Sequence, residues 1–393
     1  MKKVTTLLSC ILIYTVGFAQ QTSAYIQSQF QYGEESASLK VGGPNENKED
    51  PYSRFGIRRG RIKFTYKEGI ASAVFQIDIT EKGFDYKDIY INLKDPWSGS
   101  NSLCVGLFNR PFGYEIECSS SKRESPERSK IFCTLFPGER DLGGMITLKP
   151  TNSSLYHSIK IKAGLFAGNG PKKEIDNKKD FIGHLIVNSN IGNNINLGIG
   201  FSYYYGGVYQ GSENVYSMHN KSFVLNRDNS NIGKFAKREY FGIDGQLYIK
   251  SKLGNSSLKG EFLLGTQPGC EQNSISPNSS TLPAHDTYIR NFNGGYIMYV
   301  QEIGKLPVSA VVKYDCYNPN IKVSKNDIGL NGTGEGDIKY STIGAGLLFK
   351  VNKCIRLQAY YQWISNEKSK YLVHFNEDIK DNIFTLRLQY KFK

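Results

Sequence analysis

The chain has 393 residues, of which 39% are hydrophobic and 22% charged, so it is not a bulk-hydrophobic protein. After residue 19 no apolar run approaches the ~18 residues that a membrane-spanning helix needs, which excludes a helical membrane protein but not a transmembrane β-barrel. The net charge of +13 favours anionic partners, either small anions or a lipopolysaccharide surface.

Residues 1–19 are predicted to be a secretory signal peptide. Lys2 and Lys3 form a basic start, an apolar stretch follows, and Gly17 and Ala19 are small residues at an acceptable cleavage spacing. A lipoprotein signal ending at Cys10 is the weaker alternative, because its apolar core is too short. Export makes nucleic acid the least expected partner, and we expect residues 20–393 to form a single domain.

Residues 20–393 show the alternation of apolar and polar residues that is typical of β-strands. In chain order, the expected strands lie near 23–32, 54–67, 69–80, 84–94, 101–112, 141–150, 155–166, 180–190, 194–207, 236–251, 255–267, 289–303, 306–318, 337–351, 353–367 and 381–392. The last strand is the clearest. Its apolar face carries Phe384, Leu386, Leu388, Tyr390 and Phe392, and its polar face carries Thr385, Arg387, Gln389 and Lys391.

The connections between these strands alternate in length. Short turns at 67–69, 304–305 and 352–353 contrast with long polar segments at 33–53, 113–140, 208–235, 268–288 and 319–336. Periplasmic turns and outer loops produce this rhythm, whereas a soluble sandwich has no reason to keep it. We therefore predict an all-β fold, a 16-stranded antiparallel transmembrane β-barrel in the outer membrane of a Gram-negative bacterium, in contact with lipid and lipopolysaccharide.

The segment 113–140 is too long for an ordinary connection between strands. Loops of this length are usually functional or disordered, and its apolar residues favour an ordered loop that docks against something larger. A 16-stranded barrel leaves its interior open to water, which this loop is long enough to reach across. We predict that it folds inward and narrows the interior, anchored against the inner wall by Phe112, Ile116, Phe132 and Phe136.

Six cysteines follow the predicted signal peptide: Cys104, Cys118, Cys133, Cys270, Cys316 and Cys354. Only Cys118 and Cys133 lie close in the sequence. A disulfide between them would stabilise the fold by ~3 kcal/mol, and two buried free thiols are the equally weighted alternative. The spacings of Cys and His match no metal site, so no metal or cofactor is expected.

Four blocks of sequence resemble the phosphate-selective porin O and P family. They are residues 58–61 (RRGR), 106–113 (GLFNRPFG), 123–128 (RESPER) and 137–143 (PGERDLG). The resemblance implies a 16-stranded outer-membrane barrel, usually trimeric, with a basic lumen that passes anions. The founding members of that family favour phosphate or polyphosphate.

The strand near 54–67 carries three cations in alternate positions, Arg59, Arg61 and Lys63. Placing them on the lipid side would cost about 2–4 kcal/mol each at mid-depth, so we expect them to line the lumen. The phase of the apolar residues changes within this strand, which predicts a β-bulge near Arg58. The alternative is that these cations balance acidic lumen residues and play no part in selectivity.

Other cations are also candidates for an anion pathway. Lys160, Lys162, Arg356 and Arg387 fall on polar faces of their strands. In the long loop most charges are expected to pair with one another, and Arg110 and Arg140 are the best candidates for contact with ions. A series of separated basic groups would let an anion step along the wall without being trapped.

No enzyme motif is evident. The five histidines are scattered, GxSxG and HExxH are missing, and the glycine-rich residues 331–336 lack the Lys-Ser/Thr of a phosphate-binding loop. The leading hypothesis is an outer-membrane porin for passive diffusion of small anions, with phosphate among them. A general, weakly selective porin and a barrel that acts as a surface adhesin or receptor through its long loops are the alternatives.

Overall fold

The computed structural model describes residues 21–149 and 159–392. The predicted signal peptide lies outside the described residues. Eighteen strands form one sheet. They are β1 (Gln21–Gly33), β2 (Tyr52–Glu68), β3 (Ala71–Thr80), β4 (Gly83–Lys94), β5 (Ser102–Asn109), β6 (Arg140–Leu148), β7 (Ile159–Phe166), β8 (Asp180–Ile191), β9 (Ile195–Tyr209), β10 (Asn214–His219), β11 (Ser222–Arg227), β12 (Phe235–Ile249), β13 (Ser256–Gly269), β14 (Thr287–Glu302), β15 (Val308–Asn318), β16 (Tyr340–Lys350), β17 (Ile355–Asn366) and β18 (Ile383–Phe392).

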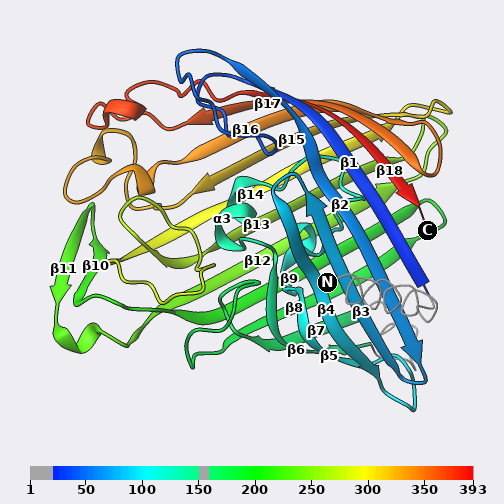
Figure 1. Ribbon diagram of the computed structural model, residues 1–393, viewed down its shortest axis with the longest axis horizontal. Coiled ribbons are helices and arrows are strands. Elements are labelled where there is room, and N and C mark those ends of the chain that lie inside the picture. Colours follow the sequence, from blue (N-terminus) through cyan, green and yellow to red (C-terminus); the bar gives the residue numbers. More distant parts are fainter. Residues whose placement is uncertain (1–20, 150–158, 393) are drawn as a thin grey trace, which may run out of the picture.

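Sixteen of these strands close into an antiparallel barrel (Figure 1). β1 pairs with both β2 and β18, and β9 pairs directly with β12, so β10 and β11 lie outside the ring. These two strands form a hairpin, and β10 also pairs in parallel with the start of β14. The predicted 16-stranded antiparallel β-barrel is confirmed.

The burial of the strands is the reverse of that in a soluble protein. In β18, Leu386, Leu388 and Tyr390 are 38–50% exposed, whereas Thr385 and Arg387 are at most 2% exposed. The strands β1, β13 and β15 show the same alternation of exposed apolar and buried polar residues over most of their length. Apolar side chains therefore form the outer surface of the barrel, and polar side chains face its interior.

The predicted β-bulge near Arg58 is confirmed. Gln27 of β1 pairs with Arg59 and Ser28 pairs with Ile57, so Arg58 is the extra residue on β2. At a bulge, two successive side chains can point toward the same side of the sheet instead of toward opposite faces. As a result, Arg58 and Arg59 both reach the same carboxylate, that of Glu127.

The loops contain short elements that the sequence pattern did not predict. The 113–140 segment holds two helices, α2 (Gly113–Glu117) and α3 (Lys130–Leu135). The 208–235 segment holds the β10–β11 hairpin, which lies apart from the ring of strands in Figure 1. One-turn 3-10 helices occur at Asn229–Asn231, Lys325–Asp327, Glu335–Asp337 and Val373–Phe375. Among the described residues, no helix is long and apolar enough to span a membrane.

Closure of the barrel leads to a first prediction, on resistance to detergent. Backbone hydrogen bonds run around the whole ring, so the sheet has no free edge at which SDS could begin to unfold it. Unboiled protein should migrate differently from boiled protein in an SDS gel, and circular dichroism should be dominated by β-structure. A helical spectrum, or solubility without detergent, would contradict the fold.

Candidate functional site

The segment between β5 and β6, residues 110–139, is held by contacts with strands on several sides of the barrel. We call it the β5–β6 segment. It contacts β1 through Ser120 and Tyr25, and it contacts β9 through the backbone of Gly113 and Ser202. It contacts β17 through the carbonyl of Glu124, which accepts from Gln358. The wall residues in these contacts are buried ones, on the polar face of the sheet.

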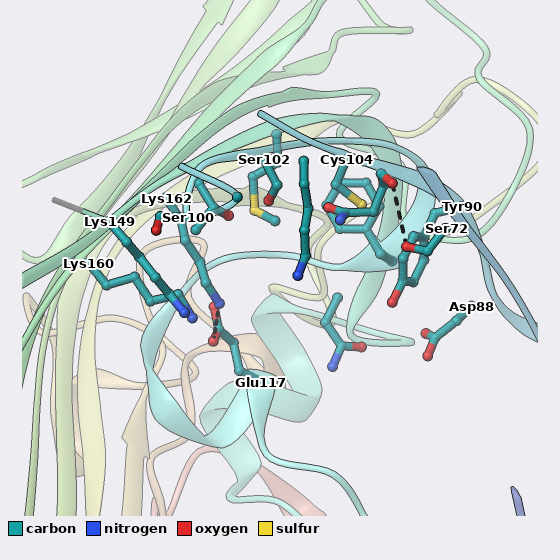
Figure 2. A pocket seen from close by; sticks show the side chains of 17 residues that line it. Ser72, Asp88, Tyr90, Ser100, Ser102, Cys104, Glu117, Lys149, Lys160 and Lys162 are labelled. Carbon is teal, nitrogen blue, oxygen red and sulfur yellow. Dashed lines mark hydrogen bonds and ion pairs between the residues drawn. The ribbon is translucent and has the colours of Figure 1, made fainter. Parts of the chain in front are cut away.

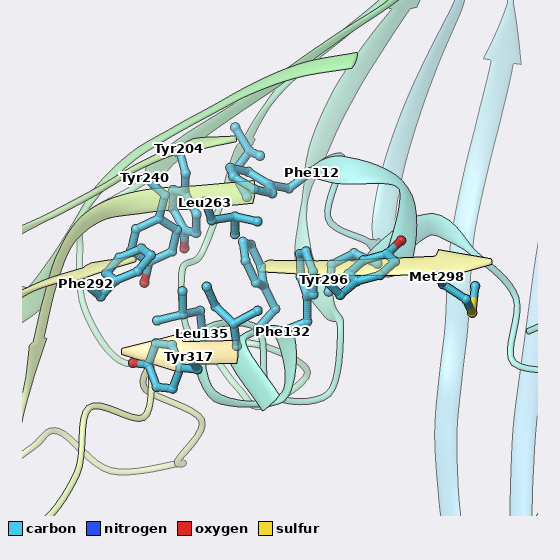
Figure 3. Packing of buried hydrophobic residues seen from close by; sticks show 14 of the residues in the cluster. Phe112, Phe132, Leu135, Tyr204, Tyr240, Leu263, Phe292, Tyr296, Met298 and Tyr317 are labelled. Carbon is cyan, nitrogen blue, oxygen red and sulfur yellow. The ribbon is translucent and has the colours of Figure 1, made fainter. Parts of the chain in front are cut away.

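The apolar residues of this segment form a cluster with aromatic residues of the wall (Figure 3). Phe112, Ile116, Phe132 and Phe136, the predicted anchors, are each at most 1% exposed. The ring of Phe132 lies 6.2 Å from that of Tyr296 on β14. The ring of Phe136 lies 6.0 Å from that of Tyr204 on β9. The structure thus places all four predicted anchors in one buried cluster on the β9–β14 side of the barrel.

On the same side, carboxylates and lysines join the segment to the wall. Lys313 of β15 donates to Glu115 over 2.6 Å, and Lys259 of β13 donates to Glu124 over 2.5 Å. The carboxylate of Glu261 on β13 accepts from the backbone N–H groups of Tyr114 and Glu115, at the start of α2. Buried charges of this kind are stable only when paired and hydrogen-bonded, so these groups fix the position of α2.

On the opposite side, Glu127 of the segment lies among three arginines. Its carboxylate is 2.9 Å from Arg58, 3.0 Å from Arg59 and 2.8 Å from Arg387. Burial alone would raise the pKa of Glu127, but these guanidinium groups hold that pKa well below its usual range. The resulting stabilisation is complete above the ordinary glutamate pKa of about 4.3. It is lost as the pH falls through the lowered pKa.

The remaining arginines among the predicted pathway residues also bind protein groups. Arg61 donates to Asp78 over 2.9 Å and to Ser120 over 3.0 Å. Arg140 donates to Asp88 over 2.6 Å. Arg110 donates to the carbonyl groups of Pro137 and Glu139, and its guanidinium lies 5.1 Å from the ring centre of Phe136.

Arg356, like Arg110, contacts an uncharged partner. It donates to Gln389 over 3.3 Å and lines a cavity of about 360 Å³ between β12, β13, β16 and β17. Lys122 of the β5–β6 segment lines the same cavity. Arginine can form paired, planar hydrogen bonds with carboxylates, so it suits the anchoring role that most of these residues have.

Other lysines border open space, together with some of the paired arginines. Two cavities, of about 640 and 340 Å³, lie beside the N-terminal strands and share Asp88, Asn109 and Glu117. Lys94, Lys149, Lys160 and Lys162 line the first cavity, which Figure 2 shows. Arg61, Lys63, Lys122, Arg128, Arg140 and Lys391 line the second.

Most of these lysines lack a partner of opposite charge. Lys162 donates to Glu117 over 2.5 Å. Within residues 21–149 and 159–392, none of Lys63, Lys94, Lys122, Lys149, Lys160 and Lys391 forms an ion pair. Residues 1–20 and 150–158 contain no Asp or Glu that could supply one. The net positive potential of the open space therefore comes from lysines.

Glu117 lies where the two cavities meet and is held from two strands. Besides Lys162 of β7, it faces His184 of β8, whose Nδ1 is 3.8 Å from its carboxylate. The other ring nitrogen of His184 is 2.9 Å from Asp244. Burial alone would raise the pKa of Glu117, but His184 and Lys162 lower it to about 2. Glu117 is therefore ionised at neutral pH and ties the end of α2 to the β7–β8 wall.

Sequence reasoning selected several residues of this site and missed others. Lys63, Lys160 and Lys162 were predicted and do line the cavities. Lys94 and Lys149 were missed, although Lys94 lies on the polar face of its strand and could have been found by alternation. Cys118 and Cys133 are both free thiols, but Cys118 is half-buried and Cys133 is exposed, so they are not the two buried thiols of the second alternative. In the described part of the chain, no group of His, Cys, Asp and Glu is arranged to hold a metal ion.

The chain resembles known proteins in fold but not in sequence. No protein-family model and no curated protein matches it. An anion-selective porin from Comamonas acidovorans has a TM-score of 0.57 at 10% identity, covering 95% of this chain and 99% of that one. OmpF of Salmonella typhi, in complex with daunomycin, has a TM-score of 0.56 at 10% identity, covering 95% and 97%. OprB of Pseudomonas putida, in its low-pH structure, has a TM-score of 0.52 at 8% identity, covering 97% and 95%. The chain therefore has the fold of these barrels.

Proposed function

We propose that this chain forms a water-filled channel in the outer membrane of a Gram-negative bacterium, through which small anions, phosphate among them, diffuse passively. The observation that carries the proposal is the set of lysines along the two joined cavities that form no ion pair within the described residues. Ammonium groups without a carboxylate partner can attract a passing anion, and their spacing keeps any one contact weak enough to release it. The likeness in fold to an anion-selective porin supports the same proposal.

We also propose that the β5–β6 segment lies inside the barrel and narrows this channel. Its contacts reach β1, β2 and β18 on one side and β9, β13 and β15 on the other, always through the polar face of the wall. The open cavities are left between the segment and the wall of β2–β7. Anions would pass on that side, where Lys63, Lys94, Lys149 and Lys160 lie.

Two further parts of the proposal concern export and assembly. Residues 1–19 would direct the chain to the secretory pathway and be removed, leaving residues 20–393 as the mature barrel. The channel would be a homotrimer in contact with lipid and lipopolysaccharide. A structure of similar fold, with 8% identity and a TM-score of 0.52, is OmpT of Vibrio cholerae in a trimer form. Cross-linking in mild detergent would test the trimer directly.

The channel is tested by recording currents across a planar bilayer under a KCl gradient. We expect the reversal potential to show preference for chloride over potassium, because the open space holds an excess of unpaired positive charge. Adding phosphate should reduce the chloride current if phosphate competes for the same lysines. A potential that shows preference for potassium would contradict the proposal. Folded protein that does not conduct would favour a surface adhesin or receptor.

A further inference from the structure

The first cavity has two chemically different walls (Figure 2). One wall carries the lysines, with Lys149 and Lys160 lying next to each other and Lys162 beside them, turned toward Glu117. The other carries Tyr90 of β4 and Cys104 of β5, and Phe108 and Met145 also line the cavity. The volume of about 640 Å³ is within the range of about 300–1,000 Å³ that small-molecule sites usually have.

The basic wall carries more positive than negative charge. Within residues 21–149 and 159–392, only Lys162 of its four lysines has a carboxylate partner, Glu117, at 2.5 Å. Lys149 and Lys160 lie beside each other in Figure 2, and their positive charges repel each other. Like charges placed side by side repel each other, and an anion with two negative groups would remove that repulsion. This wall therefore favours a dianion over a monovalent ion.

The apolar wall sets a second requirement for the ligand, namely an aromatic group. The ring of Tyr90 packs edge-on against that of Phe108, with ring centres 5.9 Å apart, and Met145 packs against the same buried cluster. Thioether and aromatic groups interact favourably with an aromatic ring. Hydroxyl and amide groups of Ser72, Asn92, Ser102 and Thr147 lie around the cavity and can orient a polar ligand. Inorganic phosphate could use the lysines but would gain nothing from the apolar wall.

We propose that this cavity is a binding site for organic dianions with an aromatic body, held by Lys149 and Lys160 at the charged end and by Tyr90 and Met145 at the apolar end. The inference rests on the proposed channel function and specifies the class of solute that the channel favours. A solute bound there would sit in the open space next to Glu117, so it would interrupt the chloride current while it is bound.

The test compares two dianions that differ in the ring. Isophthalate has two carboxylates on a benzene ring, and glutarate has two carboxylates on an aliphatic chain. Block of the chloride current by isophthalate should need about tenfold less solute than block by glutarate, because only isophthalate contacts Tyr90 and Met145. Met145→Gln should reduce this preference severalfold while leaving block by phosphate unchanged.

The lysines are tested with a matched pair of variants. Lys149→Gln with Lys160→Gln should weaken block by isophthalate at least about tenfold, because both ammonium groups are lost. Lys252→Gln with Lys305→Gln removes the same charge from exposed turns and should change that block by less than about twofold. Equal effects of the two double variants would show that general positive charge, rather than this cavity, holds the solute.

A second measurement keeps the two proposals separate. Calorimetric titration of the detergent-solubilised, folded protein with isophthalate and glutarate does not depend on conduction. Saturable binding of isophthalate, with weaker binding of glutarate, supports the site even if the barrel does not conduct. Equal binding of both dianions, or binding that Lys149→Gln with Lys160→Gln leaves unchanged, would overturn the inference even where chloride current is present.

Discussion

Deletion of residues 118–133 should raise the single-channel conductance about twofold or more, because a 16-stranded barrel without a segment inside it leaves a wide aqueous interior. The deletion removes most of α3, together with Glu127 and its contacts to Arg58, Arg59 and Arg387. The arginines would then be solvated by water instead of lying buried against the segment. The barrel should remain folded, because the pairing of β5 with β6 does not involve the deleted residues.

The preference for chloride should weaken in the same variant, since an ion in a wider opening passes farther from the wall and salt screens the lysine charges over about 10 Å. Single-channel recording gives both quantities, and migration of unboiled protein in SDS gels shows whether the barrel is intact. An intact barrel with unchanged conductance would place the segment outside the pore. The segment would then be better interpreted as a trimer contact or as a site that captures a ligand.

A single substitution tests the same anchoring more finely. Glu127→Gln leaves three arginines beside a neutral amide, and breaking a buried ion pair from one side costs about 3–5 kcal/mol. We expect this change to loosen the β5–β6 segment and to increase the current noise of the open channel in single-channel recordings. Glu49→Gln removes the same charge from an exposed outer loop and should leave the recording unchanged.

The sixteen strands of the barrel were predictable because most of them have one apolar face and one polar face. A period of two residues is imposed wherever one face meets lipid and the other meets water, and a charge on the lipid side is costly. The bulge at Arg58 followed from the same logic, since a break in the phase of apolar residues can be repaired only by an extra residue. The shortness of α2 and α3 explains why they were missed. Five or six residues are too few to show a helical period.

Which of the basic residues pair with carboxylates and which border open space could not be predicted. Arg59 and Lys63 lie on the same face of the same strand, yet Arg59 is paired with Glu127 and Lys63 borders open space. The partner of Arg59, Glu127, lies 68 residues away in the β5–β6 segment, and the same Glu127 is 260 residues from Arg387. Alternation tells which face a side chain takes, but the partner across the barrel is set by how the segment folds.

Replacing Lys63, Lys94, Lys149 and Lys160 by glutamate should reverse the ionic preference of the channel, from chloride to potassium. These four lysines border the two open cavities and have no carboxylate partner in the part of the chain that the structure describes. The change turns four positive charges into four negative ones at the surface that a passing ion meets. Reversal potentials under a KCl gradient should therefore change sign. Because none of the four holds the segment, the conductance should change far less than in the deletion variant.

The matched control changes the overall charge by the same amount elsewhere. Lys67, Lys252, Lys305 and Lys353 are exposed and lie at or next to short turns between strands. Their replacement by glutamate should shift the potential only slightly, because salt screens charges that lie more than about 10 Å from the path of the ion. If both quadruple variants shift it equally, the total charge of the barrel sets its preference. If the cavity variant folds and keeps its preference for chloride, the paired arginines or the outer loops must select the ion, and the lysines only line empty space.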